Sequence, residues 1–272
     1  METGQICGGE KPRILVATDG SHASEKAVHL AVNLARALGG ELHAVSVICE
    51  QLKRDEAHEA IERVVELFPD VRSVIREGHP ASEIVECAGE VDADLIVTGS
   101  HNRSGLERVF IGSVSEKIVR HAGTSVLVAR SSEIPKRVLI ATDGSEHSRL
   151  AIELIQHIMK KMSLEVSAVH VMDTSDPVSS QLFFEELQQR RDHALSMARK
   201  ILGDSAECIS VKGHPVSVIT EISAGYDLVV LGSHGRSGID HLLLGSVAER
   251  VARFSKSSTL IVRGKRLNTS TQ

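Results

Sequence analysis

The chain has 272 residues, of which 42% are hydrophobic, 25% charged and only 2% aromatic, and this ordinary globular composition excludes a disordered or low-complexity protein. Its formal net charge of −5 and its pI of about 6.3 lack the basic excess of nucleic-acid-binding surfaces, so we expect no nucleic-acid partner. No apolar run approaches the ~18 residues of a membrane span, and residues 1–10 carry no secretion signal. We therefore expect a cytoplasmic protein without a membrane partner.

The first predicted elements are a strand and an amphipathic helix. The apolar residues 14–17 are followed by the turn sequence Thr-Asp-Gly-Ser at 18–21. The next segment places apolar side chains on one face of a helix, and Gly39 and Gly40 predict its end. That face consists of Ala27, Leu30, Ala31, Leu34 and Leu38.

The following elements alternate in the same way. The uninterrupted apolar run at 95–97 is typical of a parallel strand with helices on both faces, and a glycine-containing loop follows it at 99–105. Short apolar runs alternating with longer amphipathic segments predict strand–helix units and a parallel sheet. The polar, proline-ended segment 131–135 then reads as a linker.

The second half of the chain repeats the first. The sequence at 14–21 returns at 138–145, Gly-His-Pro at 78–80 returns at 213–215, and the glycine loop at 99–105 returns at 232–238. The first helix face also returns, as Ala151, Leu154, Ile155, Ile158 and Met162. The second helix, predicted at 51–67 and 178–202, differs most between the copies, and we interpret its aromatic pair, Phe183 and Phe184, as core.

The repeat predicts an α/β fold with two tandem domains, 13–130 and 137–263. Each is expected to be a doubly wound, open, parallel sheet of five strands with four helices. Such sheets bind ligands beyond the carboxyl ends of their strands. The last strands, 126–129 and 260–262, would leave apolar edges, so we expect them to pair across the two copies and form an intrachain pseudo-dimer.

The phosphate-binding motifs of the best-known nucleotide folds are absent. The turn after the first strand is not G-x-G-x-x-G, and the chain has no G-x-x-x-x-G-K-[ST]. The glycines at 232, 235 and 245 instead suit an anion, because glycine permits positive φ and close backbone approach, and a helix beginning at Ser246 adds unpaired N–H groups. The alternative is that Ser246 with Glu249, and Ser113 with Glu116, are capping boxes.

Two aspartates end the first strand of each copy. Asp19 and Asp143 can accept hydrogen bonds from ribose hydroxyls or a base amino group, and the alternative is that they cap the next helix together with Ser21 and Ser145. The loop histidines, His101 and His234, are interpreted as bystanders that offer backbone contacts. Arg236 is either a phosphate contact or a solvated surface charge.

With these residues the sequence resembles the universal stress protein family, in its tandem form. Nucleotide-binding members carry G-x-x-G and, after nine intervening residues, G-[ST], and Gly232, Gly235, Gly245 and Ser246 match this spacing. The resemblance implies a Rossmann-like fold of the adenine nucleotide alpha hydrolase type with strand order 3-2-1-4-5, and ATP or AMP as ligand with Mg²⁺ held through its phosphates. The implied contacts of the second copy are Ala141, Thr142, Asp143, Val171, Leu231, Gly232, His234, Gly235, Arg236, Gly245, Ser246 and Val247.

The first copy departs from the pattern at one position, because Asn102 stands where the second glycine should be. A Cβ in left-handed backbone would cost ~1 kcal/mol, or about fivefold in affinity, so we expect the first site to be weaker than the second. The corresponding contacts would be Ala17, Thr18, Asp19, Val47, Gly99, His101, Asn102, Gly112, Ser113 and Val114.

The favoured interpretation is an adenine-nucleotide-binding protein of the stress response, without dedicated catalysis. One alternative is a slow ATPase, for which Asp143 is the one candidate base and Arg236 would stabilise the phosphoryl oxygens. The other is a nucleotide-free pseudo-dimeric scaffold that binds another small molecule. The 14 histidines form no metal-ligand spacing, so we expect no protein-held metal site. Whether whole chains form a homodimer is left open by the sequence.

Overall fold

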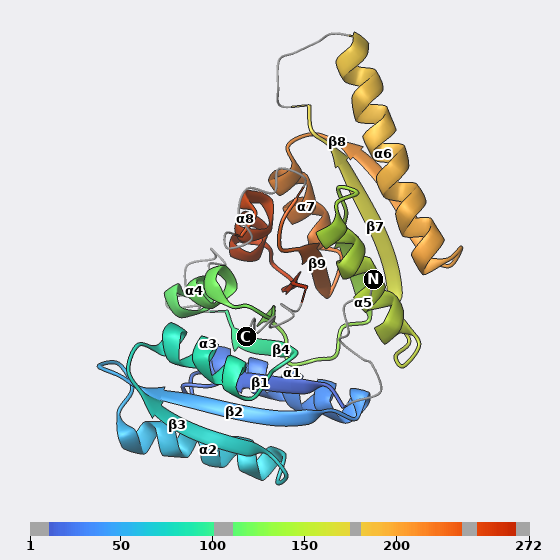
Figure 1. Cartoon of the computed structure of the whole chain (residues 1–272). Coiled ribbons are helices and arrows are strands. Elements are labelled where there is room, and N and C mark those ends of the chain that lie inside the picture. The colour runs from blue at the N-terminus through green and yellow to red at the C-terminus, as the bar shows by residue number, and fades with distance from the viewer. Residues whose placement is uncertain (1–10, 101–110, 175–180, 236–243, 265–272) are drawn as a thin grey trace, which may run out of the picture.

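The fold is seen in a computed structural model that describes residues 11–100, 111–174, 181–235 and 244–264 (Figure 1). Within these residues each copy has five strands and four helices in strict alternation, as the repeat predicts. The first copy consists of β1 (Arg13–Ala17), α1 (His22–Leu38), β2 (Glu41–Ile48), α2 (Arg54–Leu67), β3 (Arg72–Glu77), α3 (Pro80–Glu90), β4 (Leu95–Gly99), α4 (Ser113–His121) and β5 (Ser125–Ala129).

The second copy follows after a segment without helix or strand at 130–136. It consists of β6 (Arg137–Ala141), α5 (Glu146–Met159), β7 (Glu165–Met172), α6 (Gln181–Leu202), β8 (Glu207–Lys212), α7 (Pro215–Ser223), β9 (Leu228–Gly232), α8 (Ser246–Phe254) and β10 (Ser258–Val262). The prediction for the first helix of this copy was too long by one turn, because α5 ends at Met159. Met162 packs against the core from the segment beyond that helix.

The strands of the described residues lie in one sheet of ten, in the order β3-β2-β1-β4-β5-β10-β9-β6-β7-β8. Each half therefore has the expected order 3-2-1-4-5, with parallel pairing inside the half. The two halves join through β5 and β10, which pair antiparallel with Leu127 opposite Leu260. The expected pairing of the two apolar edges is confirmed, and neither edge is left open.

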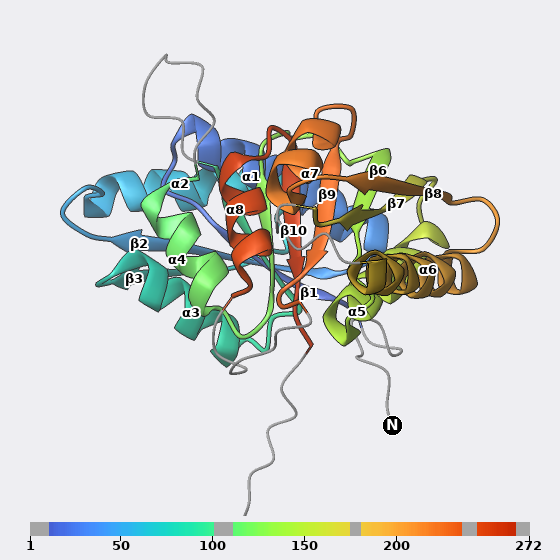
Figure 2. The ribbon, with the colours of Figure 1, turned by 90° about the horizontal axis from the view of Figure 1, so that it is seen from above.

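Helices cover both faces of this sheet, and each face has one core that runs through both copies. One core collects buried side chains of α1, α2, α5 and α6. The other collects those of α3, α4, α7 and α8, and Figure 2 shows α4 and α8 side by side where the copies meet. The continuous apolar runs of β4 and β9 are explained by this double cover.

The aromatic pair of α6 is not core. Phe184 is 43% exposed and Leu182 is 77% exposed, so the interpretation of this pair as core is wrong for Phe184. The helix has 22 residues, or about 33 Å, whereas β7 beneath it has 8 residues, or about 26 Å. Its N-terminal part extends past the sheet (Figure 1), so the first turns find no strand to pack on.

A buried histidine on β2 predicts a dependence of stability on pH. His43 is 7% exposed, and burial, followed by the positive charge of Arg72, lowers its pKa. The unfolded chain, with a histidine pKa of about 6.5, then binds the proton before the folded chain does. We expect the melting temperature to fall between about pH 7.5 and about pH 5.5, and to fall less in His43→Gln. Thermal unfolding at the two pH values measures this, and equal falls in both proteins would contradict it.

Candidate functional site

The turn after the first strand of each copy is held by its own polar side chains. In the second copy the Ser145 amide donates to Asp143 Oδ1 at 3.0 Å, and the Gly144 amide donates to Thr142 Oγ1 at 3.3 Å. Gly144 adopts φ +78° and its counterpart Gly20 φ +70°, a backbone region that favours glycine. The Thr-Asp-Gly-Ser sequence thus makes a defined turn at the carboxyl edge of the sheet.

The serine of this turn, rather than the aspartate, caps the next helix. Ser145 Oγ accepts from the Ser148 amide at 3.3 Å, and Ser21 Oγ accepts from the Ser24 amide at the same distance. The aspartate closes the turn, since Asp19 Oδ1 accepts from the Ser21 amide at 3.1 Å. The structural role weighed for the aspartates is therefore present, but as a turn contact and not as the helix cap.

The first glycine of the loop is required by the protein's own packing. A Cβ at Gly99 would lie 2.4 Å from the carbonyl oxygen of Ala23, and one at Gly232 would lie 2.5 Å from the carbonyl carbon of His147. Both neighbours are backbone atoms in the first turn of the helix that follows β1 or β6. The strand end and the helix start can approach this closely because no side chain lies between them.

The second glycine faces the aspartate of the turn. A Cβ at Gly235 would lie 2.8 Å from Asp143 Oδ2. The expectation that these glycines supply left-handed backbone is wrong, because Gly232, Gly235 and Gly245 all lack positive φ. A side chain at this position would instead press on the carboxylate of Asp143. Asn102 itself lies outside the described residues.

The helices α4 and α8 begin without a side-chain cap. Their N-cap residues are Gly112 and Gly245, and Ser113 and Ser246 are the first residues of the helices. The capping-box alternative is therefore wrong, since neither serine side chain closes its helix. The first N–H groups of both helices are thus left without a side-chain acceptor, and an uncapped helix start suits an anion.

A cavity of about 1140 Å³ brings these features of the first copy together. Predicted contacts that line it are Ala17, Thr18, Asp19, Val47, Gly99, Gly112, Ser113 and Val114. Its wall also includes residues that were not predicted from the sequence, among them Gln51, Leu52, Arg63, Arg130 and Lys256. The predicted His101 lies outside the described residues.

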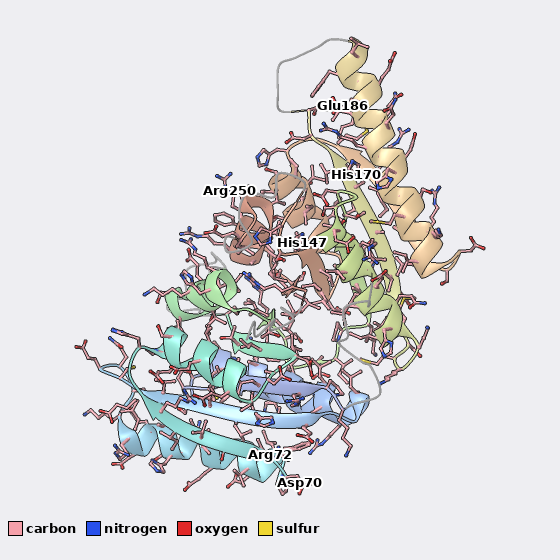
Figure 3. The ribbon with its side chains drawn as sticks, in the orientation of Figure 1. Asp70, Arg72, His147, His170, Glu186 and Arg250 are labelled. Carbon is pink, nitrogen blue, oxygen red and sulfur yellow. The ribbon has the colours of Figure 1, made fainter. Side chains whose placement is uncertain are left out.

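The second copy has two contacts at its strand ends that the described part of the first copy lacks. The Gly245 amide donates to the Ser233 carbonyl at 2.8 Å, which draws the start of α8 onto the end of β9; the described part of the first copy has no counterpart of this bond. His147 (Figure 3), in the position that Ala23 holds in the first copy, places its ring 4.9 Å from that of His234. Arg236 lies outside the described residues.

The remaining predicted contacts of the second copy lie at the same edge. Ala141 and Val171 are half-buried and Leu231 is buried, each at or near the end of its strand. His170 (Figure 3), next to Val171, has its Nδ1 2.8 Å from the Thr142 carbonyl oxygen. Ser246 is exposed and Val247 half-buried at the start of α8.

The described residues offer neither a metal-ligand cluster nor a membrane-spanning helix. They hold no group of three or more His, Cys, Asp or Glu side chains placed to bind a metal ion. None of the described helices is long and apolar enough to cross a membrane.

The comparisons with known proteins agree on one family. A model of the universal stress protein family matches residues 12–61, 48–130 and 135–263. A universal stress protein of Mycobacterium tuberculosis (strain H37Rv) is 30% identical over 234 residues, which cover 78% of each chain. Another from Mycolicibacterium smegmatis is 27% identical over 289 residues, covering 92% of this chain and 96% of that one.

A solved structure of the family has the same fold over nearly the whole chain. The crystal structure of a universal stress protein from Archaeoglobus fulgidus covers 92% of this chain and 98% of its own, with a TM-score of 0.70 and 20% identity. A universal stress protein solved in complex with cAMP covers 48% of this chain, with 27% identity and a TM-score of 0.39.

Proposed function

The chain belongs to the universal stress protein family, because the family model matches both of its copies, and we propose that it binds an adenine nucleotide, ATP or AMP, at the carboxyl edge of each half of its sheet. We further propose that the bound nucleotide serves a role in stress adaptation and that the chain has no dedicated catalytic activity. The two halves would then act as the two subunits of a dimer within one chain.

The cavity of the first copy is the observation that carries this proposal. Its volume of about 1140 Å³ is ample for a small molecule, since such pockets measure ~300–1,000 Å³. Val45, Val47 and Ile84 give it an apolar wall that suits a purine ring, whereas the uncapped start of α4 gives it N–H groups that suit an anion. A nucleotide has both of these parts.

The proposed roles follow from where each residue lies. In the first copy the base would lie against Ala17, Thr18, Asp19 and Val47, and the phosphates against Gly99 and the residues 112–114. The equivalents in the second copy are Ala141, Thr142, Asp143 and Val171 for the base, and Gly232, Gly235, Gly245, Ser246 and Val247 for the phosphates. Mg²⁺ would be held mainly by phosphate oxygens, because the described side chains offer no ligand cluster.

We propose the second site as the tighter one. It keeps every glycine of the pattern, and a side chain at Gly235 would press on Asp143 Oδ2. Asn102 stands at the equivalent position of the first copy, so the first site would carry that cost. Calorimetry that resolves two affinities for AMP would test this order.

Placing a carboxylate in the first turn of α4 should weaken anion binding without destabilising the helix, so the two effects can be measured separately. Ser113 is exposed, and Ser113→Asp should leave the melting temperature unchanged or slightly raised, because acidic residues stabilise helix N-termini by about 0.3–1 kcal/mol. The same charge should repel phosphate, and we expect the first site to bind ATP at least about tenfold more weakly. Ser246→Asp should have the same effect at the second site. Titration calorimetry with ATP measures both.

The matched control is Ser217→Asp. Ser217 is exposed in the first turn of α7 and is not part of the cavity wall, so this variant adds the same charge at a helix start without touching the proposed sites. Its ATP affinity should equal that of the unaltered chain. If the unaltered chain binds neither ATP nor AMP, the proposal is wrong and the nucleotide-free scaffold takes its place.

A further inference from the structure

The two copies meet where β5 pairs with β10, and this joint has a local twofold symmetry. Ser125 begins β5 and Ser258 begins β10, and each serine accepts a hydrogen bond from the other copy. The Arg130 amide donates to Ser258 Oγ at 3.1 Å, and the Arg263 amide donates to Ser125 Oγ at 3.2 Å. These matched contacts identify which residues of the two copies are equivalent across the joint.

The side chains of the same two arginines each donate hydrogen bonds to a helix of the other copy. The Arg130 guanidinium donates to the Ala252 carbonyl near the end of α8 at 2.7 Å, and that of Arg263 donates to the Val119 carbonyl near the end of α4 at 2.8 Å. Cations are favoured at helix C-termini, so each copy supplies a charge that stabilises a helix of the other. Up to this point the two sides match.

The twofold symmetry is broken at the position two residues before β5 and two residues before β10. Lys256 precedes β10, whereas Gly123 precedes β5 at the equivalent position. Lys256 lines the cavity of the first copy together with Arg130. The first copy offers the second no side chain at the equivalent position, because residue 123 is glycine. The cavity of the first copy therefore includes a cationic residue of the other copy that has no twofold equivalent.

The positive charge at this end of the cavity lacks a carboxylate partner among the described residues. The Arg130 side chain donates to carbonyl and hydroxyl oxygens only, and its buried Nε has no partner. Burial lowers the pKa of Arg130 to about 10, as expected for a cation that no anion compensates. Lys256 is exposed and makes no hydrogen bond or ion pair within the described part of the chain.

The acidic residues of the cavity wall are engaged elsewhere. Glu56 accepts from the Lys53 amide at 2.8 Å at the start of α2, and Glu59 pairs with Arg63 at 3.8 Å. Asp19 closes the turn after β1. None of these described carboxylates pairs with Arg130 or Lys256, so the end of the cavity next to the joint suits a group with several negative charges.

We propose that Arg130 and Lys256 form a phosphate subsite at which the second copy completes the first copy's cleft, so that the first site distinguishes ATP from AMP more strongly than the second does. The inference rests on the proposed nucleotide binding. It assigns the outer phosphates of ATP, which AMP lacks, to a cationic pair drawn from both halves of the chain.

The test compares ATP and AMP by titration calorimetry in the full chain. Lys256→Ala should weaken ATP binding at the first site about fivefold and leave AMP binding unchanged. Lys117→Ala is the matched control, because Lys117 is exposed on α4 outside the cavity wall, and it should leave the ratio of the two affinities as it is.

A second variant adds the missing lysine. A Cβ at Gly123 would meet no atom within 4 Å, so Gly123→Lys should fold, and we expect it to raise the preference of the second site for ATP over AMP about fivefold. An unchanged ratio in Lys256→Ala, with both nucleotides still bound, would overturn this inference alone. A chain that binds neither nucleotide would overturn the proposed function as well.

Discussion

Gly99→Ala is expected to lower the melting temperature by about 6–12 °C. The added Cβ would lie 2.4 Å from the carbonyl oxygen of Ala23 and 2.9 Å from the amide nitrogen of Ser24. Both are backbone atoms in the first turn of α1, and moving that turn would disturb the cap that Ser21 gives the helix. Overpacking against such rigid neighbours costs about 3 kcal/mol. Differential scanning calorimetry measures the change.

Two further glycines make this a controlled test. A Cβ at Gly89, in α3, would meet nothing within 4 Å, so Gly89→Ala should hold or raise the melting temperature, because alanine favours a helix by about 1 kcal/mol over glycine. Gly232→Ala should behave like Gly99→Ala, since its Cβ would meet the backbone of His147. A Gly99→Ala chain that melts like the unaltered protein would show that this close approach does not require glycine.

The glycine spacing predicted the helix start correctly, because α8 begins at Ser246 directly after Gly245. The backbone conformation expected of Gly232, Gly235 and Gly245 was wrong. The left-handed backbone that was expected there is found instead at Gly144, inside the turn after β6. A sequence shows that a position excludes a side chain, but it does not show whether backbone conformation, a neighbouring helix or a ligand is the cause. Loss of nucleotide binding in a Gly232 variant would therefore be no test of a phosphate contact.

The fold itself was predictable because the chain contains it twice. The two copies of one motif order predicted the number of strands and helices in each half. The apolar edges of β5 and β10 predicted the pairing that joins the halves. The contribution of Lys256 to the first cavity was not predictable in this way, since it depends on contacts between residues distant in the chain. The hydrogen bonds that Arg130 and Arg263 make to the opposite copy depend in the same way on the pairing of β5 with β10.

Arg130→Met is expected to destabilise the joint by about 3 kcal/mol, seen as a melting temperature lower by about 6–12 °C. Methionine fills much of the same space but donates no hydrogen bond. The carbonyl oxygens of Ala252 and Ser257 would lose their donors from Arg130, and a buried acceptor left without a partner costs about 1–3 kcal/mol. Scanning calorimetry of the full chain measures the loss, and it also shows whether the two halves begin to unfold separately.

Arg263→Met is the matched variant, because the twofold joint gives Arg263 the same task toward the Val119 and Arg120 carbonyls. The two variants should lose similar stability, since each removes the side chain that donates to the C-terminal end of a helix in the other copy. They should differ in ligand binding, because only Arg130 shares its cavity with a lysine from the other copy. We expect Arg130→Met to weaken ATP more than AMP at the first site and Arg263→Met to leave that ratio unchanged. If both variants change the ratio of ATP to AMP affinity at the first site equally, the residues that distinguish ATP from AMP lie outside the joint. If neither variant lowers the melting temperature, Arg130 and Arg263 do not hold the two halves together.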